Sequence, residues 1–212
     1  MATTLVFSPD ATALLAAAHP QSGQAWRELA LRWNVAVGEG DPCVAVRQAQ
    51  LACWRGAGVG LPLLRQLARP GVLVLRTAQG QPLHAVLVAL DFSHAVLQVG
   101  PQQFGLTLGA LAQVWRGEFY TLWRTPDTWR EGMDATAQPA LRSWALQRGV
   151  DSSAPPPGST HAAATTPFIE QLRVYQMAQG LPADGRLGPL TLMHLSRMSG
   201  VSEPVLAAVS SR

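Results

Sequence analysis

A cysteine and a histidine are the two residues of this sequence best suited to covalent chemistry. Cys43 lies in the first turn of an expected helix that Asp41 and Pro42 begin, where the helix dipole lowers the pKa of a thiol. His84 opens an apolar, strand-like run 41 residues later, and an imidazole there can act as the base for a thiol nucleophile. If the two side chains meet in space, they predict a cysteine hydrolase.

The same residues also fit a structural role. Cys43 and Cys53 are the only cysteines, they stand ten residues apart, and in an oxidising compartment they would pair. A disulfide removes the nucleophile, so the two interpretations of Cys43 exclude each other in the oxidised protein. His84 can equally be an ordinary strand histidine, and the spacing alone favours the structural interpretation.

Composition argues against several other kinds of site. The five histidines fall at no ligand spacing and no CxxC occurs, so we expect neither a metal nor a cofactor. All 16 basic residues are arginines, scattered along a chain of net charge +3, which disfavours nucleic acid as a partner. With 48% apolar and 14% charged residues among 212, the chain is typical of a globular protein. No apolar run approaches the ~18 residues of a membrane span.

Three apolar runs must position His84. They begin at Gly71, at Pro82 and at His94, each has the length of a strand, and turn residues separate them. Val72 to Leu75 and Ala85 to Leu90 are almost continuously apolar, which predicts a strand meander covered on both faces.

Helices and further strands are expected around this meander. Ser22 and Thr107 are predicted to cap helices, and Asp41 to cap the helix that carries Cys43. The predicted helices are 24–33, 43–50, 61–68 and one that begins after Thr107, and the predicted further strands are 51–54 and 118–124. Residues 1–130 therefore read as an α+β domain.

The last third has a different organisation. Helices are predicted at 139–148, 167–179 and 189–198. Residues 151–166 consist almost entirely of Ser, Pro, Ala and Thr, which predicts a linker without a core. Residues 131–212 therefore form a second, small three-helix domain that contains this linker.

This second domain resembles the three-helix peptidoglycan-binding domains found on many wall hydrolases. The match consists of an aromatic-Gln pair, a Gly-Leu turn, an Asp-Gly loop, a glycine and a helix-opening threonine. Gly180 suits a helix C-cap, and Asp184-Gly185 suits a tight turn. The resemblance implies peptidoglycan as a partner and a binding site that comprises Tyr175, Gln176, Asp184, Gly185, Gly188 and Thr191.

The first domain resembles the papain-like C39 cysteine peptidases. Cys43 falls at their nucleophile position and His84 at their base position. Where that family has an Asp before a Pro, this chain has Gly100, and Val44 replaces the glycine that follows the nucleophile. A histidine without its orienting carboxylate is a poor base. The resemblance therefore implies a degenerate peptidase domain with no catalytic residues.

The two domains in this order resemble the periplasmic region of the type II secretion protein A family. That family has a cytoplasmic ATPase and a membrane helix ahead of this region, so we expect this chain to be the periplasmic part of an inner-membrane protein. The resemblance implies a non-catalytic peptidoglycan-binding module that helps to place the secretin in the wall, with the secretin and an inner-membrane protein as partners. Because a periplasm is oxidising, it also implies a Cys43–Cys53 disulfide.

Two other functions remain open from the sequence. One is an active C39-like peptidase or wall hydrolase that uses Cys43 as nucleophile and His84 as base. The other is a scaffold in which the first domain docks a protein partner and the second is merely structural.

Overall fold

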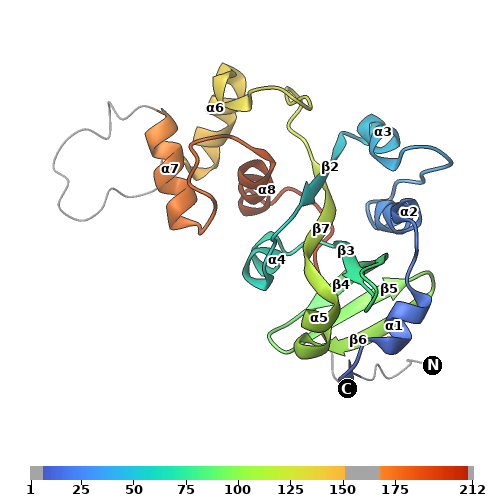
Figure 1. The fold of residues 1–212 in the computed structure, drawn as a ribbon. Helices are drawn as coiled ribbons and strands as arrows, with labels where there is room; N and C mark the ends of the chain where they lie inside the picture. Colours follow the sequence, from blue (N-terminus) through green and yellow to red (C-terminus); the bar gives the residue numbers. More distant parts are fainter. Residues whose placement is uncertain (1–6, 151–167, 210–212) are drawn as a thin grey trace. The chain divides into compact units, whose positions relative to one another are not determined.

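The computed structural model describes residues 7–150 and 168–209 (Figure 1). The chain divides into two compact units, Met1–Trp123 with Glu203–Arg212, and Arg124–Ser202. The boundary predicted at 130/131 differs from this division, because the segment after Trp123 already belongs to the second unit and the last residues return to the first.

The first unit is built on a seven-stranded mixed sheet, which confirms the predicted α+β class. Its strands lie in the order β1-β6-β5-β4-β3-β7-β2. The run from β3 to β6 is antiparallel, β7 pairs antiparallel with β3, and β1 pairs parallel with β6. The elements are β1 (Phe7–Ser8), α1 (Thr12–Ala17), α2 (Ser22–Arg32), α3 (Pro42–Ala45), η1 (Val46–Ala49), β2 (Leu51–Gly56), α4 (Leu61–Leu67), β3 (Gly71–Arg76), β4 (Pro82–Leu90), β5 (His94–Val99), β6 (Gln102–Thr107), α5 (Leu108–Val114) and β7 (Trp115–Arg124).

The predicted meander is confirmed as β3, β4 and β5. Val72 to Leu75 and Ala85 to Ala89 are buried throughout, as continuous apolarity implies for a sheet covered on both faces. The meander has a fourth strand that we did not predict. β6 begins with two glutamines, and its strand conformation comes from an unbroken antiparallel pairing with β5.

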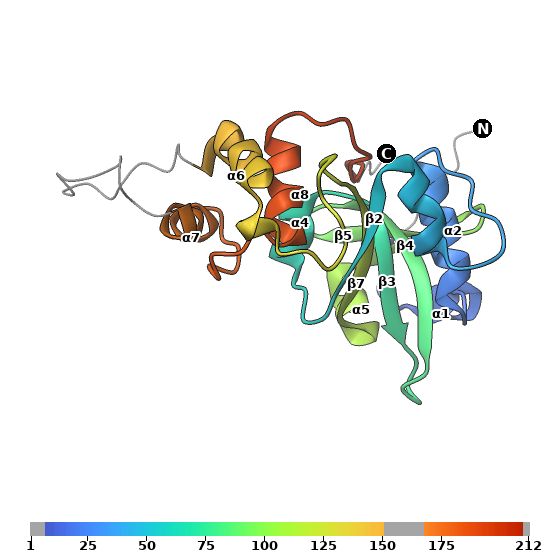
Figure 2. The ribbon, with the colours of Figure 1, turned by 90° about the horizontal axis from the view of Figure 1, so that it is seen from above.

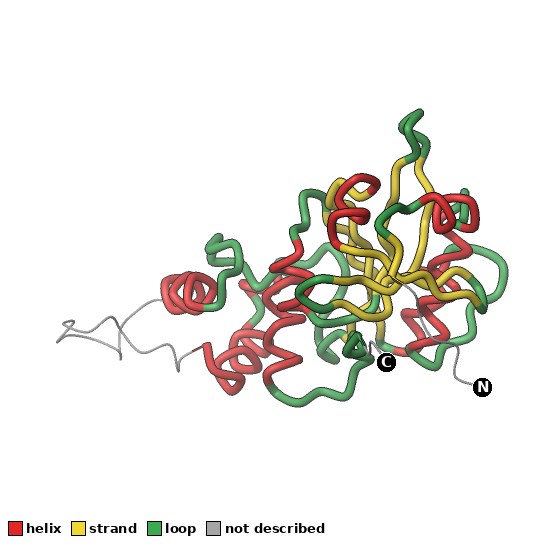
Figure 3. The backbone as a smooth tube through the Cα atoms, turned by 90° about the horizontal axis from the view of Figure 1, so that it is seen from below, coloured by secondary structure: helices red, strands yellow, loops and turns green. Residues whose placement is uncertain are grey.

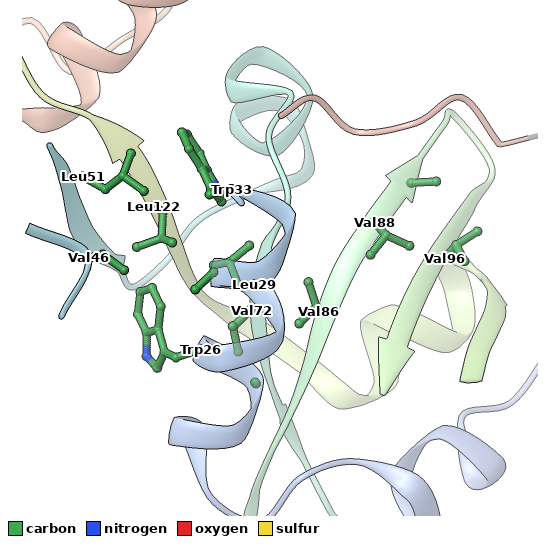
Figure 4. Close-up of a cluster of buried hydrophobic side chains, with 13 residues drawn as sticks. Trp26, Leu29, Trp33, Val46, Leu51, Val72, Val86, Val88, Val96 and Leu122 are labelled. Carbon is green, nitrogen blue, oxygen red and sulfur yellow. The ribbon is translucent and has the colours of Figure 1, made fainter. Parts of the chain in front are cut away.

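Helix α2 covers one face of the sheet. Trp26 and Leu29, spaced by three residues, pack against Val72 of β3, Val86 of β4 and Leu122 of β7 (Figure 4). All five side chains are buried, so this cluster is the centre of the core on that face.

Helices α4 and α5 lie on the opposite face (Figure 2). Because successive strand residues point to opposite faces, Leu73 and Leu75 are directed there. As predicted, the Thr107 hydroxyl caps α5, accepting the Ala110 N–H at 3.2 Å. Leu111 of this helix is buried.

Other predictions near the N-terminus need correction. Ser22 is the first residue of α2 and not its cap, because Gln21 occupies the N-cap position without a side-chain bond. Helix α1 and strand β1 were not predicted. The helix expected over 43–50 is one α-turn followed by a 3-10 turn, and Gln50 ends it at φ +55°.

The end of the chain returns to the first unit. Arg69 and Glu203 form a buried ion pair with a 2.9 Å separation between Nη2 and Oε2. The Leu206 N–H donates to the Ala68 carbonyl at 2.8 Å, and the Ala207 N–H donates to the Val88 carbonyl at 3.0 Å. These bonds pair backbone groups that would otherwise need water.

The described part of the second unit consists of helices and loops (Figure 3). It comprises η2 (Ala135–Ala137), α6 (Pro139–Ala145), the π-turn η3 (Leu146–Val150), α7 (Phe168–Ala178) and α8 (Pro189–Met198). The predicted ranges of α7 and α8 are confirmed within a residue, whereas α6 ends early. The predicted linker 151–166 lies outside the described residues. Of the helices that are described, none combines the length and apolarity needed to cross a bilayer.

Candidate functional site

The Cys43 sulfur is not a free thiol in this structure. The Asp41 side chain accepts the Cys43 N–H at 2.9 Å, so the residue does lie at a capped helix start. Its sulfur, however, is bonded to Cys53, with the two Cα atoms 5.5 Å apart. In this state the dipole of α3 has no thiolate to stabilise.

His84 lies in the third residue pair from the end of the β3–β4 ladder, opposite Val74. It is buried, and its Nδ1 donates to the His19 carbonyl at 3.1 Å. Burial lowers the pKa of His84, so the ring is neutral at pH 7. Among the residues that the structure describes, no hydrogen bond joins His84 to Cys43.

Gly100 does have a carboxylate beside it, supplied by a residue that we did not predict. The Gly100 N–H donates to Glu28 Oε1 at 2.8 Å, and the same oxygen accepts from His19 Nε2 at 2.6 Å. Glu28 thus orients His19 and not His84. No sequence pattern indicates this contact, because 72 residues separate Glu28 from Gly100.

His19, Glu28 and His84 thus form a polar cluster with a structural role. His19 bonds to Glu28 through its ring and to His84 through its backbone, so the segment that follows α1 is tied to α2 and β4. In the described part of the chain, no three His, Cys, Asp or Glu side chains are grouped closely enough to hold a metal.

The predicted binding residues of the second unit do come together, around Gln176. This side chain is 1% exposed. Its Oε1 accepts the Gly185 N–H at 2.8 Å, and its Nε2 lies 3.0 Å from each of three acceptors: Asp184 Oδ1, the Arg186 carbonyl and Thr191 Oγ1. Gln176 therefore fixes the Asp-Gly loop against α7 and α8.

Tyr175 and Thr191 are likewise buried. The Tyr175 hydroxyl is hydrogen-bonded to Nδ1 of His194 on α8 at 2.7 Å. Burial raises the pKa of Tyr175 to about 12 and lowers that of His194, so both are neutral at pH 7. In the aromatic-Gln pair of the motif, Tyr175 thus ties α7 to α8, and Gln176 positions the loop from beneath.

The exposed part of the motif lines a surface groove of about 740 Å³. Asp184, Gly185 and Gly188 lie on one side of it, and the segment 132–136 lies on the other. The Leu187 N–H donates to Thr136 Oγ1 at 2.8 Å and ties the two sides together.

The groove carries both signs of charge. Asp184 and Asp134 each use Oδ1 for backbone N–H groups, and the Oδ2 atoms have no partner among the described residues. The Arg186 guanidinium is exposed and also lacks a described partner. Arg173 is paired with Glu170 at 2.6 Å. Asp134, Thr136 and Arg186 were not predicted, since only folding brings the segment before α6 to the loop before α8.

No protein-family model matches the chain. The general secretion pathway protein A of Aeromonas hydrophila is 28% identical over 170 residues, which cover 80% of this chain and 31% of that protein. The chain thus spans about a third of the length of this relative.

A solved structure of a secretion protein is also similar to this chain. The crystal structure of a periplasmic domain of the EpsAB fusion protein of the Vibrio vulnificus type II secretion system matches with a TM-score of 0.55 and 25% identity. The match covers 90% of this chain and 84% of that one.

The fold is therefore that of a periplasmic domain of a type II secretion system. More narrowly, the chain is homologous in sequence and in structure to the periplasmic domain of type II secretion protein A, which confirms the predicted resemblance.

Proposed function

We propose that this chain is a non-catalytic periplasmic module whose second unit binds peptidoglycan and helps a type II secretion complex to place its secretin in the wall. The similarity of the chain to a general secretion pathway protein and to a type II secretion domain supports the secretion role. The secretin and an inner-membrane protein are the partners that this role requires.

The observation that carries the wall-binding part is the groove built on the Gln176 network. It presents two carboxylate oxygens and one guanidinium without described partners. A peptide with both ammonium and carboxylate groups matches that pattern, and the stem peptides of peptidoglycan have both. A charge-assisted hydrogen bond of this kind contributes roughly 1.5–3 kcal/mol.

The motif residues divide into two roles under this proposal. Asp184 and Arg186, which are exposed, contact the ligand. Tyr175, Gln176 and Thr191 are buried and hold the loop in its binding conformation. Gly185 has no room for a side chain, because an added Cβ would meet Ile169 Cγ2 at 2.8 Å, and Gly188 leaves its part of the groove open.

Cosedimentation of the full chain with purified sacculi tests the proposal. Arg186→Ala and Asp184→Asn should each weaken binding about tenfold, which corresponds to ~1.4 kcal/mol. Asn at 184 keeps an oxygen for Gln176, so the loop should persist. Arg142→Ala, an arginine outside the groove, is the matched control. Unchanged binding in both groove variants would move the site elsewhere.

We further propose that the first unit is a C39-like domain that has lost peptidase activity. A thiol enzyme needs a thiolate, a base within reach and a group that orients the base. Here the sulfur is in a disulfide, His84 bonds to a backbone carbonyl, and the nearest carboxylate to Gly100 serves His19.

Labelling with a thiol-directed electrophile under mild reduction tests the loss of activity. Cys43 should react no faster than Cys53, and His84→Ala should not change the rate. Rapid labelling of Cys43 at neutral pH that depends on His84 would establish the peptidase alternative.

A further inference from the structure

A second pocket lies within the second unit, between the segment after β7 and one face of α6. Its volume is about 480 Å³, within the range typical of small-molecule sites. None of its lining residues also lines the groove. The residues from the helical region recur three or four positions apart, so they share one face: Ala140, Ser143, Trp144, Gln147 and Arg148.

The lining has the composition that a sugar ring requires. Trp144 is partly exposed and supplies an apolar aromatic surface. Hydroxyl and amide groups surround it, from Thr125, Thr128, Ser143 and Gln147. A pyranose has an apolar C–H face that packs on an indole ring, and its hydroxyl groups need hydrogen-bonding partners at the edge.

Arg148 gives this pocket a charge preference. Its guanidinium carbon lies 4.1 Å from the centre of the Trp144 ring, and Nη1 donates to the Trp144 carbonyl at 3.3 Å. In the described parts of the chain no carboxylate pairs with it, and its buried Nε has no partner. Arg124 and Asp127 line the same pocket and their opposite charges cancel, so the net positive charge of the pocket comes from Arg148.

A partly buried cation without an anion is costly, and a ligand carboxylate would lower that cost. The planar guanidinium matches a carboxylate in geometry, and its stacking on Trp144 holds it in one orientation. Because the guanidinium occupies one face of the indole, the sugar ring would pack on the part of Trp144 that stays exposed, with its carboxylate next to Arg148.

We propose that this pocket binds a sugar that carries a carboxylate. In a cell wall that group is the lactyl carboxylate of muramic acid after its stem peptide has been removed. The assignment to muramic acid rests on the proposed wall-binding function, whereas the carboxylated-sugar site rests on the pocket alone.

Nuclear magnetic resonance on the full chain tests this with three soluble probes. N-acetylmuramic acid has the sugar and the carboxylate, N-acetylglucosamine has only the sugar, and lactate has only the carboxylate. The indole N–H signal of Trp144, assigned with Trp144→Phe, should shift with N-acetylmuramic acid at a concentration at least fivefold lower than with either other probe. Equal binding of lactate would reduce the pocket to an anion site, and equal binding of N-acetylglucosamine would remove the role of Arg148. Either result overturns the proposal, as does the absence of any shift.

Variants of one arginine complete the test. Arg148→Gln should weaken N-acetylmuramic acid at least fivefold and leave N-acetylglucosamine unchanged. Arg148→Lys keeps the charge but not the planar guanidinium, so it should lose an intermediate amount of affinity for N-acetylmuramic acid. This variant replaces the glutamine variant in the test if the latter does not fold. Arg142→Gln, on the preceding helix α6 but outside the pocket, should bind normally. Wild-type affinity in both Arg148 variants would overturn the proposal. Because none of the probes carries a stem peptide, their failure leaves sacculus binding through the groove intact.

Discussion

Replacing Gln176 should release the Asp-Gly loop of the second unit. Gln176→Ala leaves the Gly185 N–H without its acceptor and removes the donor shared by Asp184, Arg186 and Thr191. An unpaired buried donor costs about 1–3 kcal/mol, and the other lost bonds contribute about 1 kcal/mol each. Partial solvation of the freed loop offsets some of this cost. We therefore expect the free energy needed to open the loop to fall by about 3 kcal/mol.

Amide hydrogen exchange of Gly185 in the full chain measures this directly. A loss of about 3 kcal/mol accelerates exchange roughly 100-fold, since every 1.4 kcal/mol is a factor of ten. Met177→Ala is the control, because Met177 is the next residue of α7 and is 66% exposed. It should change exchange less than threefold. If Gln176→Ala also changes exchange less than threefold, the hydrogen bonds do not hold the loop.

Gln176→Glu separates the two halves of the network. The variant keeps an acceptor for the Gly185 N–H but places a carboxylate where Nε2 now faces Asp184 at 3.0 Å. Two close carboxylates raise the pKa of at least one of them above its unfolded value. The folded state then binds more protons than the unfolded state, so the variant should recover stability as pH falls through that raised pKa. Stability that stays constant between pH 7 and pH 4 would contradict this account.

Three further predictions concern other residues. Thiol titration of denatured, unreduced protein should find almost no free thiol, and replacing both Cys43 and Cys53 by Ser should lower the unfolding free energy by about 2–3 kcal/mol, as expected for a short loop; two titratable thiols would refute it. Gly185→Ala should destabilise by at least ~1 kcal/mol more than Gly180→Ala in thermal unfolding. Both glycines have positive φ, but only at 185 would the new Cβ meet a neighbouring side-chain carbon at 2.8 Å, so equal losses would contradict the packing. Stability should fall as pH drops below the ordinary imidazole pKa of about 6.5, because burial lowers the pKa of His194 and the unfolded chain takes up a proton first. Denaturant titrations at pH 7 and pH 5 should show a smaller drop in His194→Gln, and an identical drop would exclude this histidine.

Features that depend on neighbouring residues were predictable. Asp41 and Thr107 cap the helices that the sequence indicates, because a cap bonds to a backbone N–H two or three residues away. The ranges of α7 and α8 follow from helical periodicity and from the turn residues between them. The missed strand β6 shows the limit, because its glutamines have no strand signal and its partner β5 specifies its conformation.

The sequence by itself determined most of the helices and strands, their order, and a motif pattern close enough to a known family to be recognised. Only the tertiary structure decided which groups meet. It joins Cys43 to Cys53, directs Glu28 to His19, and places Gln176 beneath the loop rather than on the surface. The physical reason is range: hydrogen bonds and disulfides require atoms to approach within a few ångströms, and for residues far apart in the chain that approach depends on how whole elements pack.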